Sequence, residues 1–164
     1  MKFISLTKGK YAIVDDDEIL DGRKYYCNTN GYATRSTSRI FGKQRQSFLH
    51  IEIYEKMIGR KLNGGEEVDH EDRNPLNCQK SNLRFATRGQ NTHNIGLRST
   101  NTSGYIGVNW NSKLGKWRVR ISKDSKRICL GCYDDIQQAA KIYDEAAKIY
   151  HGDFAVLNFP ESEG

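Results

Sequence analysis

The stretch that decides the fold of the first half of this chain is residues 68–84, VDHEDRNPLNCQKSNLR, which TRGQNTHN follows at residues 87–94. It predicts a short strand ending at His70, a loop rich in asparagine, a second strand over Leu83–Ala86 and a helix over residues 88–95. Two strands and a helix in so short a segment fold back on themselves. We therefore expect polar side chains at the strand end and on the helix to converge.

Four of those polar side chains have the chemistry that phosphodiester hydrolysis needs. Asp69 and His70 are neighbours at the strand end, and Asn82 and Asn91 follow the histidine at twelve and twenty-one positions. A neutral histidine accepts a proton from water near pH 7. Asp and Asn oxygens suit a hard cation such as Mg²⁺, with water and phosphate completing its shell. The alternative is a surface loop in which the asparagines only form turns.

The spacing favours the first interpretation, because D-H-x-x-x-N-x-x-N-x(4)-N-L-R with a later Q-N-x-x-N resembles the HNH nuclease family. The variant is the one whose third motif position is Asn, and the pattern is close to that of phage- and intron-encoded homing endonucleases. The resemblance implies a ββα-metal fold with His70 as the general base. It further implies that Asp69 and Asn91 hold one Mg²⁺ or Mn²⁺ ion, and that Asn82 fixes the loop and the orientation of His70.

Three residues around the motif leave alternatives open. His93 competes with Asn91 for the third motif position, although Asn91 keeps the family spacing. Arg73 stands where the family usually has a glycine, which would ease a tight turn, whereas an arginine there can reach a DNA phosphate. His50, before a predicted helix, either contacts DNA or packs structurally, and we favour the structural role.

The upstream residues predict further strands, and a polar stretch predicts a domain boundary. Short strands are expected over residues 11–14, 24–27, 32–35 and 46–49, and a helix over 50–58. Residues 98–103 are small and polar, which is typical of a linker. We therefore expect a nuclease domain at residues 1–97, with its ββα-metal core at about 66–96, and a second domain at residues 104–160.

The second segment predicts a three-stranded sheet covered by one helix. Strands are expected over residues 105–110, 116–122 and 127–133, and an amphipathic helix over residues 134–150 with Asp134 as its cap. Arg118 and Arg120 alternate with apolar residues of the middle strand, so they share a face with Arg127 away from the helix. Seven Lys or Arg and one acid lie between residues 104 and 128. This face is either a solvated sheet surface or one that enters the major groove of DNA.

The motifs of this segment resemble the AP2/ERF DNA-binding family. They are GYIGV at residues 104–108, GKW at 115–117, LG at 130–131, YDEAA at 143–147 and LNFP at 157–160. The resemblance implies DNA contacts by Asn109, Arg118, Arg120 and Arg127, with Tyr143 touching a phosphate. Three positions, 106, 109 and 129, differ from the plant transcription factors, so the plant target sequence does not carry over.

Composition excludes several other classes. The chain has 164 residues and a net charge of +6, with no apolar run near the length of a membrane helix and no signal-peptide core. Cys129 and Cys132 have zinc-knuckle spacing, but they fall in a predicted strand and lack a second pair, which argues against a zinc site. Because no signal-peptide core is present, we expect reduced thiols in a cytoplasmic setting, the host cell's if the gene is viral.

Together these patterns predict an α+β protein that is a metal-dependent DNA endonuclease of the HNH homing type. We expect double-stranded DNA as its partner, no membrane, no small-molecule cofactor, and a monomer that nicks. The alternative is a non-catalytic AP2-type DNA-binding regulator with a decayed nuclease domain.

Overall fold

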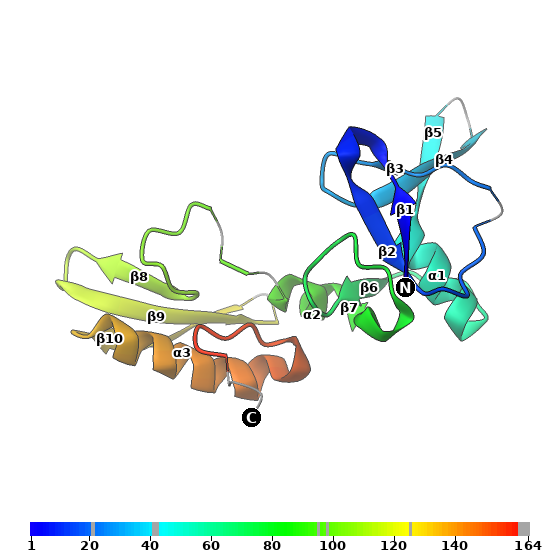
Figure 1. The fold of residues 1–164 in the computed structure, drawn as a ribbon. Helices are drawn as coiled ribbons and strands as arrows, with labels where there is room; N and C mark the ends of the chain where they lie inside the picture. The colour runs from blue at the N-terminus through cyan, green and yellow to red at the C-terminus, as the bar shows by residue number, and fades with distance from the viewer. Residues whose placement is uncertain (21, 41–42, 95, 98, 125, 161–164) are drawn as a thin grey trace. The chain divides into compact units, whose positions relative to one another are not determined.

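The computed structural model describes residues 1–20, 22–40, 43–94, 96–97, 99–124 and 126–160. Contacts divide the chain into two compact units, Met1–Thr87 and Arg88–Gly164 (Figure 1). Both mix small antiparallel sheets with few helices, so the mixed α and β composition agrees with the prediction. No helix within the described ranges is long and apolar enough to cross a membrane.

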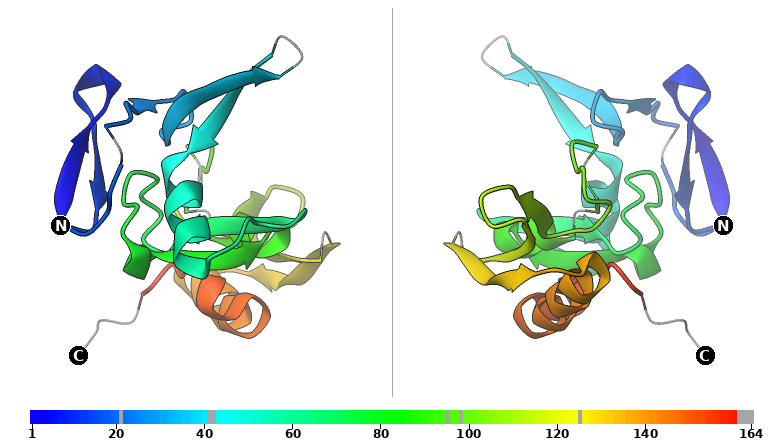
Figure 2. Two further views of the ribbon diagram at one scale, coloured as in Figure 1. Left: turned by 90° about the vertical axis from the view of Figure 1, so that its right-hand side faces the viewer. Right: turned by 90° about the vertical axis from the view of Figure 1, so that its left-hand side faces the viewer.

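The first unit contains three small sheets around one long helix (Figure 2). The 3-10 turns are η1 (Thr7–Gly9) and η2 (Lys80–Asn82). The helix is α1 (Leu49–Ile58), and it ends at Gly59, whose φ of 69° is left-handed. The sheets pair β1 (Lys2–Ser5) with β2 (Tyr11–Val14), β4 (Ala33–Ile40) with both β3 (Tyr26–Cys27) and β5 (Lys43–Phe48), and β6 (Glu66–His70) with β7 (Leu83–Thr87).

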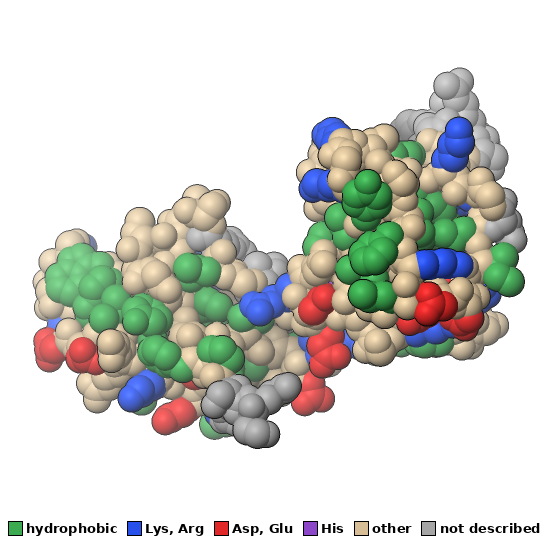
Figure 3. Space-filling model, viewed as in Figure 1, with side chains coloured by type: hydrophobic (Ala, Val, Ile, Leu, Met, Phe, Trp, Pro, Cys, Tyr) green, Lys and Arg blue, Asp and Glu red, His purple; other side chains and the backbone are tan. Residues whose placement is uncertain are grey.

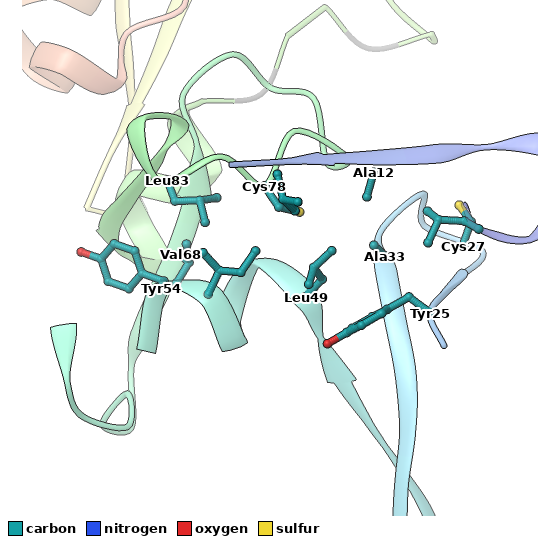
Figure 4. Packing of buried hydrophobic residues seen from close by; sticks show 12 residues of the cluster. Ala12, Tyr25, Cys27, Ala33, Leu49, Tyr54, Val68, Cys78 and Leu83 are labelled. Atoms are coloured by element: carbon teal, nitrogen blue, oxygen red, sulfur yellow. The ribbon is translucent and has the colours of Figure 1, made fainter. Parts of the chain in front are cut away.

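The core of this unit draws side chains from α1, from strands of all three sheets and from the loops between them. Leu49 of α1 is fully buried, and Val68 of β6, Leu83 of β7 and Cys78 of the intervening loop lie in the same cluster (Figure 4). Each of these side chains removes apolar surface from water. The cluster therefore fixes β6 and β7, which carry the central motif, against the start of α1.

The N-terminal hairpin holds the loop between β6 and β7. The backbone N–H of Ile13 donates to the Leu76 carbonyl at 2.8 Å, and the Cys78 N–H donates to the Ile13 carbonyl at 2.8 Å. Two residues further along both segments, the Lys80 N–H donates to Asp15 Oδ2 at 2.8 Å. Strand β1, which the sequence patterns did not predict, pairs with β2 along its length and completes this hairpin.

The loop itself opens with a strained turn. The Arg73 N–H donates to the His70 carbonyl at 2.9 Å, and Arg73 has a φ of +63°. This left-handed conformation is unfavourable for a residue with a Cβ atom, whereas glycine adopts it without that steric cost. The structure thus gives a reason why a glycine suits this position better than the arginine found in this chain.

The second unit begins with the short helix α2 (Arg88–His93) and contains the predicted sheet and helix. Its strands β8 (Val108–Asn111), β9 (Lys116–Lys123) and β10 (Lys126–Tyr133) are antiparallel in the order β10–β9–β8. Helix α3 (Ile136–His151) covers one face of this sheet and leads into the 3-10 turn η3 (Gly152–Phe154) (Figure 1).

The predicted cap of α3 is wrong by one residue. The side chain of Asp135 accepts a hydrogen bond from the Gln138 N–H at 2.6 Å, so Asp135 is the N-cap. Asp134 lies one residue before it and pairs instead with Lys116, at 3.0 Å between Nζ and Oδ2. Both aspartates precede the helix, and the pattern alone did not distinguish them.

Close packing joins α3 to the sheet. Ala139, Ala140 and Ala147 are fully buried in the same cluster as Val119 and Ile121 of β9. Small side chains allow a helix to approach a sheet closely, as the sequence pattern predicted.

The segments flanking this core are also tied to it. Asp144 accepts hydrogen bonds from the backbone N–H groups of Asn158 and Phe159, both at 2.8 Å. Before β8, the Ser103 hydroxyl donates to the Val108 carbonyl at 2.7 Å. The end of the expected linker, residues 98–103, is therefore part of the second unit, whose first residue by contacts is Arg88.

Substitution of Gly107 is expected to destabilise the second unit strongly. A Cβ there would lie 2.0 Å from a Tyr143 ring carbon, and Gly107 has a φ of +74°. Because of the left-handed conformation and the overlap, Gly107→Ala should lower the free energy of unfolding, measured in urea, by about 2 to 4 kcal/mol. Gly104→Ala is the matched control, since Gly104 has a φ of +79° with nothing within 4 Å, and it should lose only about 1 kcal/mol. Equal losses would contradict the packing argument.

Substitution of Arg73 by glycine is expected to stabilise the first unit. Arg73→Gly relieves the left-handed strain and should raise the free energy of unfolding by about 1 kcal/mol, measured by urea denaturation. Arg73→Ala keeps a Cβ and should bring no such gain. If the two variants change stability equally, the arginine side chain and not its backbone conformation decides the effect.

Candidate active site

Asp69 and His70 occupy the last two positions of β6. The register pairs Asp69 with Arg84 and His70 with Leu83 of β7. Both polar residues are 5% exposed, which is rare for groups that can carry charge. Because the strand ends at His70 and the chain turns away, the imidazole lies at the rim of the first unit's core.

Burial decides the protonation state of His70. It lowers the pKa of the imidazole below its ordinary value, and the negative charges of Asp72 and Asp69 oppose this effect without cancelling it. The neutral form is therefore the one present at neutral pH. A neutral imidazole can accept a proton, which is the property that a general base needs.

Aromatic rings surround this imidazole. The ring of His50 meets that of His70 edge to face, with centroids 4.7 Å apart, and the ring of Tyr32 lies 5.9 Å from His70. Phe48 in turn lies 5.6 Å from His50 and 5.9 Å from Tyr32. His50 is 5% exposed, so its position agrees with the structural role that we favoured.

Asp69 has a cationic partner that the sequence analysis missed. Nε of Arg84 donates to Asp69 Oδ2 at 2.9 Å, and Arg84 Nη1 lies 3.7 Å from a Glu71 carboxylate oxygen. The positive charge of Arg84 offsets part of the cost of burying the Asp69 carboxylate. The signal was present in the sequence, because the register of two predicted antiparallel strands places these residues opposite one another.

Asn82 organises the loop after His70. Its side-chain amide donates to Asp72 Oδ1 at 3.0 Å and to the Asn77 carbonyl at 2.8 Å, and its Oδ1 accepts from the Asp72 N–H at 3.0 Å. Asp72 also accepts from Asn77 Nδ2 at 2.7 Å. These contacts are those expected of a residue that fixes the loop, while its part in catalysis stays a prediction.

The remaining nuclease candidates are not brought into this cluster within the first unit. Asn91 lies on α2, which belongs to the second unit, and is partly exposed. His93 ends α2, and its side chain lies outside the described residues. Arg73 is exposed on the loop.

The donor chemistry fits a hard cation. The described residues contain no group of three His, Cys, Asp or Glu side chains that could hold a metal ion. A site of one carboxylate and one amide oxygen, completed by water and phosphate, is the kind that Mg²⁺ accepts. Asp69 is a carboxylate held by Arg84 at a strand end, so its chemistry suits this arrangement.

The second unit carries a basic sheet face. Val119 and Ile121 of β9 pack toward α3, so Arg118 and Arg120 between them point to the opposite face. The register places Asn109 opposite Arg118, and Arg120 donates to Asn109 Oδ1 at 3.2 Å. Arg127 of β10 lies opposite Ser122 and is exposed. Four of the five DNA contacts predicted in this unit thus share one face, all except Tyr143.

Tyr143 differs from the other predicted DNA contacts. It lies on α3 and is 8% exposed, with its ring against Gly107. It also lines a cavity together with Asn109 and Arg120, so it borders the same end of the sheet. Its contact with a phosphate stays a prediction.

The two closely spaced cysteines flank a bulge. Cys129 and Cys132 lie on either side of an irregularity in β10 that occurs between Cys129 and Gly131. Both are free thiols, and no metal-binding group of three among the described residues includes them.

Comparisons with known proteins agree with both halves of this description. A family model described as HNH endonuclease matches residues 47–93. Protein 3.8 of Escherichia phage T7 is 33% identical over 65% of this chain and 86% of its own length. The chain is also similar to dehydration-responsive element-binding protein 2A of Arabidopsis thaliana, which is 45% identical over 30% of this chain and 15% of its own length.

A third relative spans both units. The uncharacterized HNH endonuclease L560 of Acanthamoeba polyphaga mimivirus is 34% identical over 92% of this chain and 76% of its own length. The family model covers α1, β6, β7 and α2, and the match to this relative covers the same motif and its structural supports. The chain therefore belongs to the HNH endonuclease family.

Proposed function

We propose that this protein is a metal-dependent DNA endonuclease of the homing type, in which a ββα-metal module cleaves and an AP2-like module positions the site. The observation that carries the proposal is the adjacent pair Asp69 and His70, buried at the end of β6 with the imidazole neutral. A base beside a carboxylate that suits Mg²⁺ is the minimum equipment for phosphodiester hydrolysis. Membership of the HNH family supports the same reaction class.

The mechanism follows from the roles of these side chains. His70 takes a proton from a water molecule, whose oxygen forms a bond to the scissile phosphorus. The bond from phosphorus to the 3′ oxygen breaks, and the departing oxygen takes a proton from solvent water, which leaves 5′-phosphate and 3′-hydroxyl ends. Asp69 and Asn91 would hold a divalent cation, which supplies charge stabilisation to the phosphate and the leaving oxygen. Asn82 keeps the loop in place by bridging Asp72 and Asn77.

The basic sheet is proposed as the DNA-binding surface of residues 104–160. A three-stranded sheet of this kind presents Arg118, Arg120 and Arg127 together, and arginine bonds both guanine edges and phosphates. Similarity to plant AP2/ERF proteins supports this role. Binding by this sheet would position the nuclease module, and a single chain with one active site would nick one strand.

Cleavage is expected to depend on His70 and on a divalent cation. The wild-type protein should nick supercoiled plasmid or phage DNA with Mg²⁺ or Mn²⁺, and EDTA should abolish nicking. His70→Ala should lower the rate about 10²- to 10⁴-fold, because it removes the base. Gel mobility shift in EDTA should show unchanged DNA binding by the variant.

The matched control for this test is Asn63→Ala, an exposed asparagine of the same unit whose side-chain amide donates to Glu66 Oε1 at 3.4 Å. It should leave the rate within a few fold once folding is confirmed by circular dichroism. A wild-type protein that binds DNA but cleaves none of these substrates with either ion would instead identify a DNA-binding regulator with a decayed nuclease domain.

DNA binding is expected to depend on the basic sheet face. Arg120→Ala and Arg127→Ala should each weaken binding, and each lost phosphate contact should reduce the slope of log K against log salt by about 0.9. Lys141→Ala is the control, since Lys141 is exposed on α3, which covers the other face. Mobility shifts at several salt concentrations measure both effects. Equal losses in all three variants would show that overall charge, not this face, governs binding.

A further inference from the structure

His50 is a buried histidine for which the mechanism above has no role. It lies in the first turn of α1, directly after Leu49, which is fully buried. Its ring meets the His70 ring edge to face at 4.7 Å, with 61° between their planes. Two histidine rings from distant parts of the chain therefore share one contact at the proposed catalytic base.

The surroundings make His50 a rigid neighbour. Its backbone belongs to a helix that packs against β6 and β7, and Ile53 one turn later is anchored in the core. Behind its ring stand Tyr32, at 5.3 Å between centroids, and Phe48, at 5.6 Å. Tyr32 comes from a separate segment and Phe48 precedes His50 by two residues, and together their rings leave the His50 ring little room to move.

His50 also remains uncharged when it lies against His70. Burial, and then the nearby His70, lower the pKa of His50 to about 3. Its Nδ1 is buried and has no hydrogen-bond partner within the described part of the chain. A neutral ring adds no repulsion when the neighbouring imidazole takes up a proton, and it remains a packing surface throughout the reaction.

We propose that His50 is a positioning residue, whose ring, supported by Tyr32 and Phe48, holds the His70 imidazole in the orientation that accepts the proton of the attacking water. This inference rests on the proposed function, since it takes His70 as the general base. A histidine at a strand end can turn about two side-chain bonds. Displacement of a reacting group by about 1 Å costs on the order of 100-fold in rate, so a ring that blocks this turning affects turnover directly.

The test compares variants that keep or remove the ring. His50→Phe keeps a ring of similar size, whereas His50→Ala and His50→Gln remove it. With Mn²⁺ and supercoiled plasmid DNA, the single-turnover nicking rate should fall about 100-fold in the Ala and Gln variants and should recover to within about tenfold of wild type in the Phe variant. DNA affinity, measured by mobility shift in EDTA, should stay within about twofold in all of them. Ile53→Val, on the same helix, controls for lost stability and should keep the wild-type rate.

A second measurement does not depend on cleavage. In metal-free protein labelled with ¹³C-histidine, the ring signals of His70, assigned with His70→Ala, should shift and broaden in His50→Gln and stay sharp in His50→Phe. If the wild-type protein cleaves no DNA, the proposed function fails. The His70 ring signals would still show whether the His50 ring holds the His70 ring in place.

The inference would be overturned if the His70 signals were unchanged in His50→Gln, or if the variants without a ring nicked DNA at the wild-type rate. It would also be overturned if His50→Phe were as slow as His50→Gln. Loss of DNA affinity in parallel with rate would also overturn it, because His50 would then act on DNA. If His50→Ala does not fold, the Gln and Phe variants decide.

Discussion

The antiparallel pairing of β6 with β7 is the constraint on which the rest of the first unit depends. Asp69 and His70 are successive residues of β6 and point to opposite faces of the strand pair. A shift of one residue would exchange these faces for both side chains and separate Asp69 from Arg84. The buried Val68 and Leu83 hold the register, so the same apolar contacts that stabilise the unit also place the two polar groups. Structure and proposed chemistry are therefore specified by one set of contacts.

One buried carboxylate in each unit is held by partners from another segment of the chain. Asp144 is bonded by the backbone of residues 158–159, and Asp69 by Arg84. Apolar side chains still reach the surface of both units, among them Phe3, Tyr11, Trp110 and Leu114 (Figure 3). The polar groups are thus the more informative features, because leaving them buried without partners would cost free energy.

Sequence patterns predicted the local elements well where periodicity was strong. The strands of the second unit and α3 fall within a few residues of the predicted ranges, because alternation and the alanine stripe report burial directly. The position of His70 at a strand end was predicted for the same reason. The ring contacts of Tyr32 and His50 with His70 and the tie between Ile13 and the loop were not, because each joins residues far apart in the chain. Strand β1 was also not predicted, although it pairs with the neighbouring strand β2. The cap at Asp135 was missed because two adjacent aspartates offer the same chemistry.

The tie between β2 and the motif loop has a consequence for how the protein folds. Ile13 bonds to Leu76 and Cys78, which lie more than sixty positions away in the chain. Forming this contact closes a long loop and lowers the conformational entropy of the chain, so it is expected to form late in folding. Local elements such as α1 can form before that closure. Until the hairpin docks, the loop beside His70 lacks its bonds to Ile13 and is held only by its own contacts around Asn82.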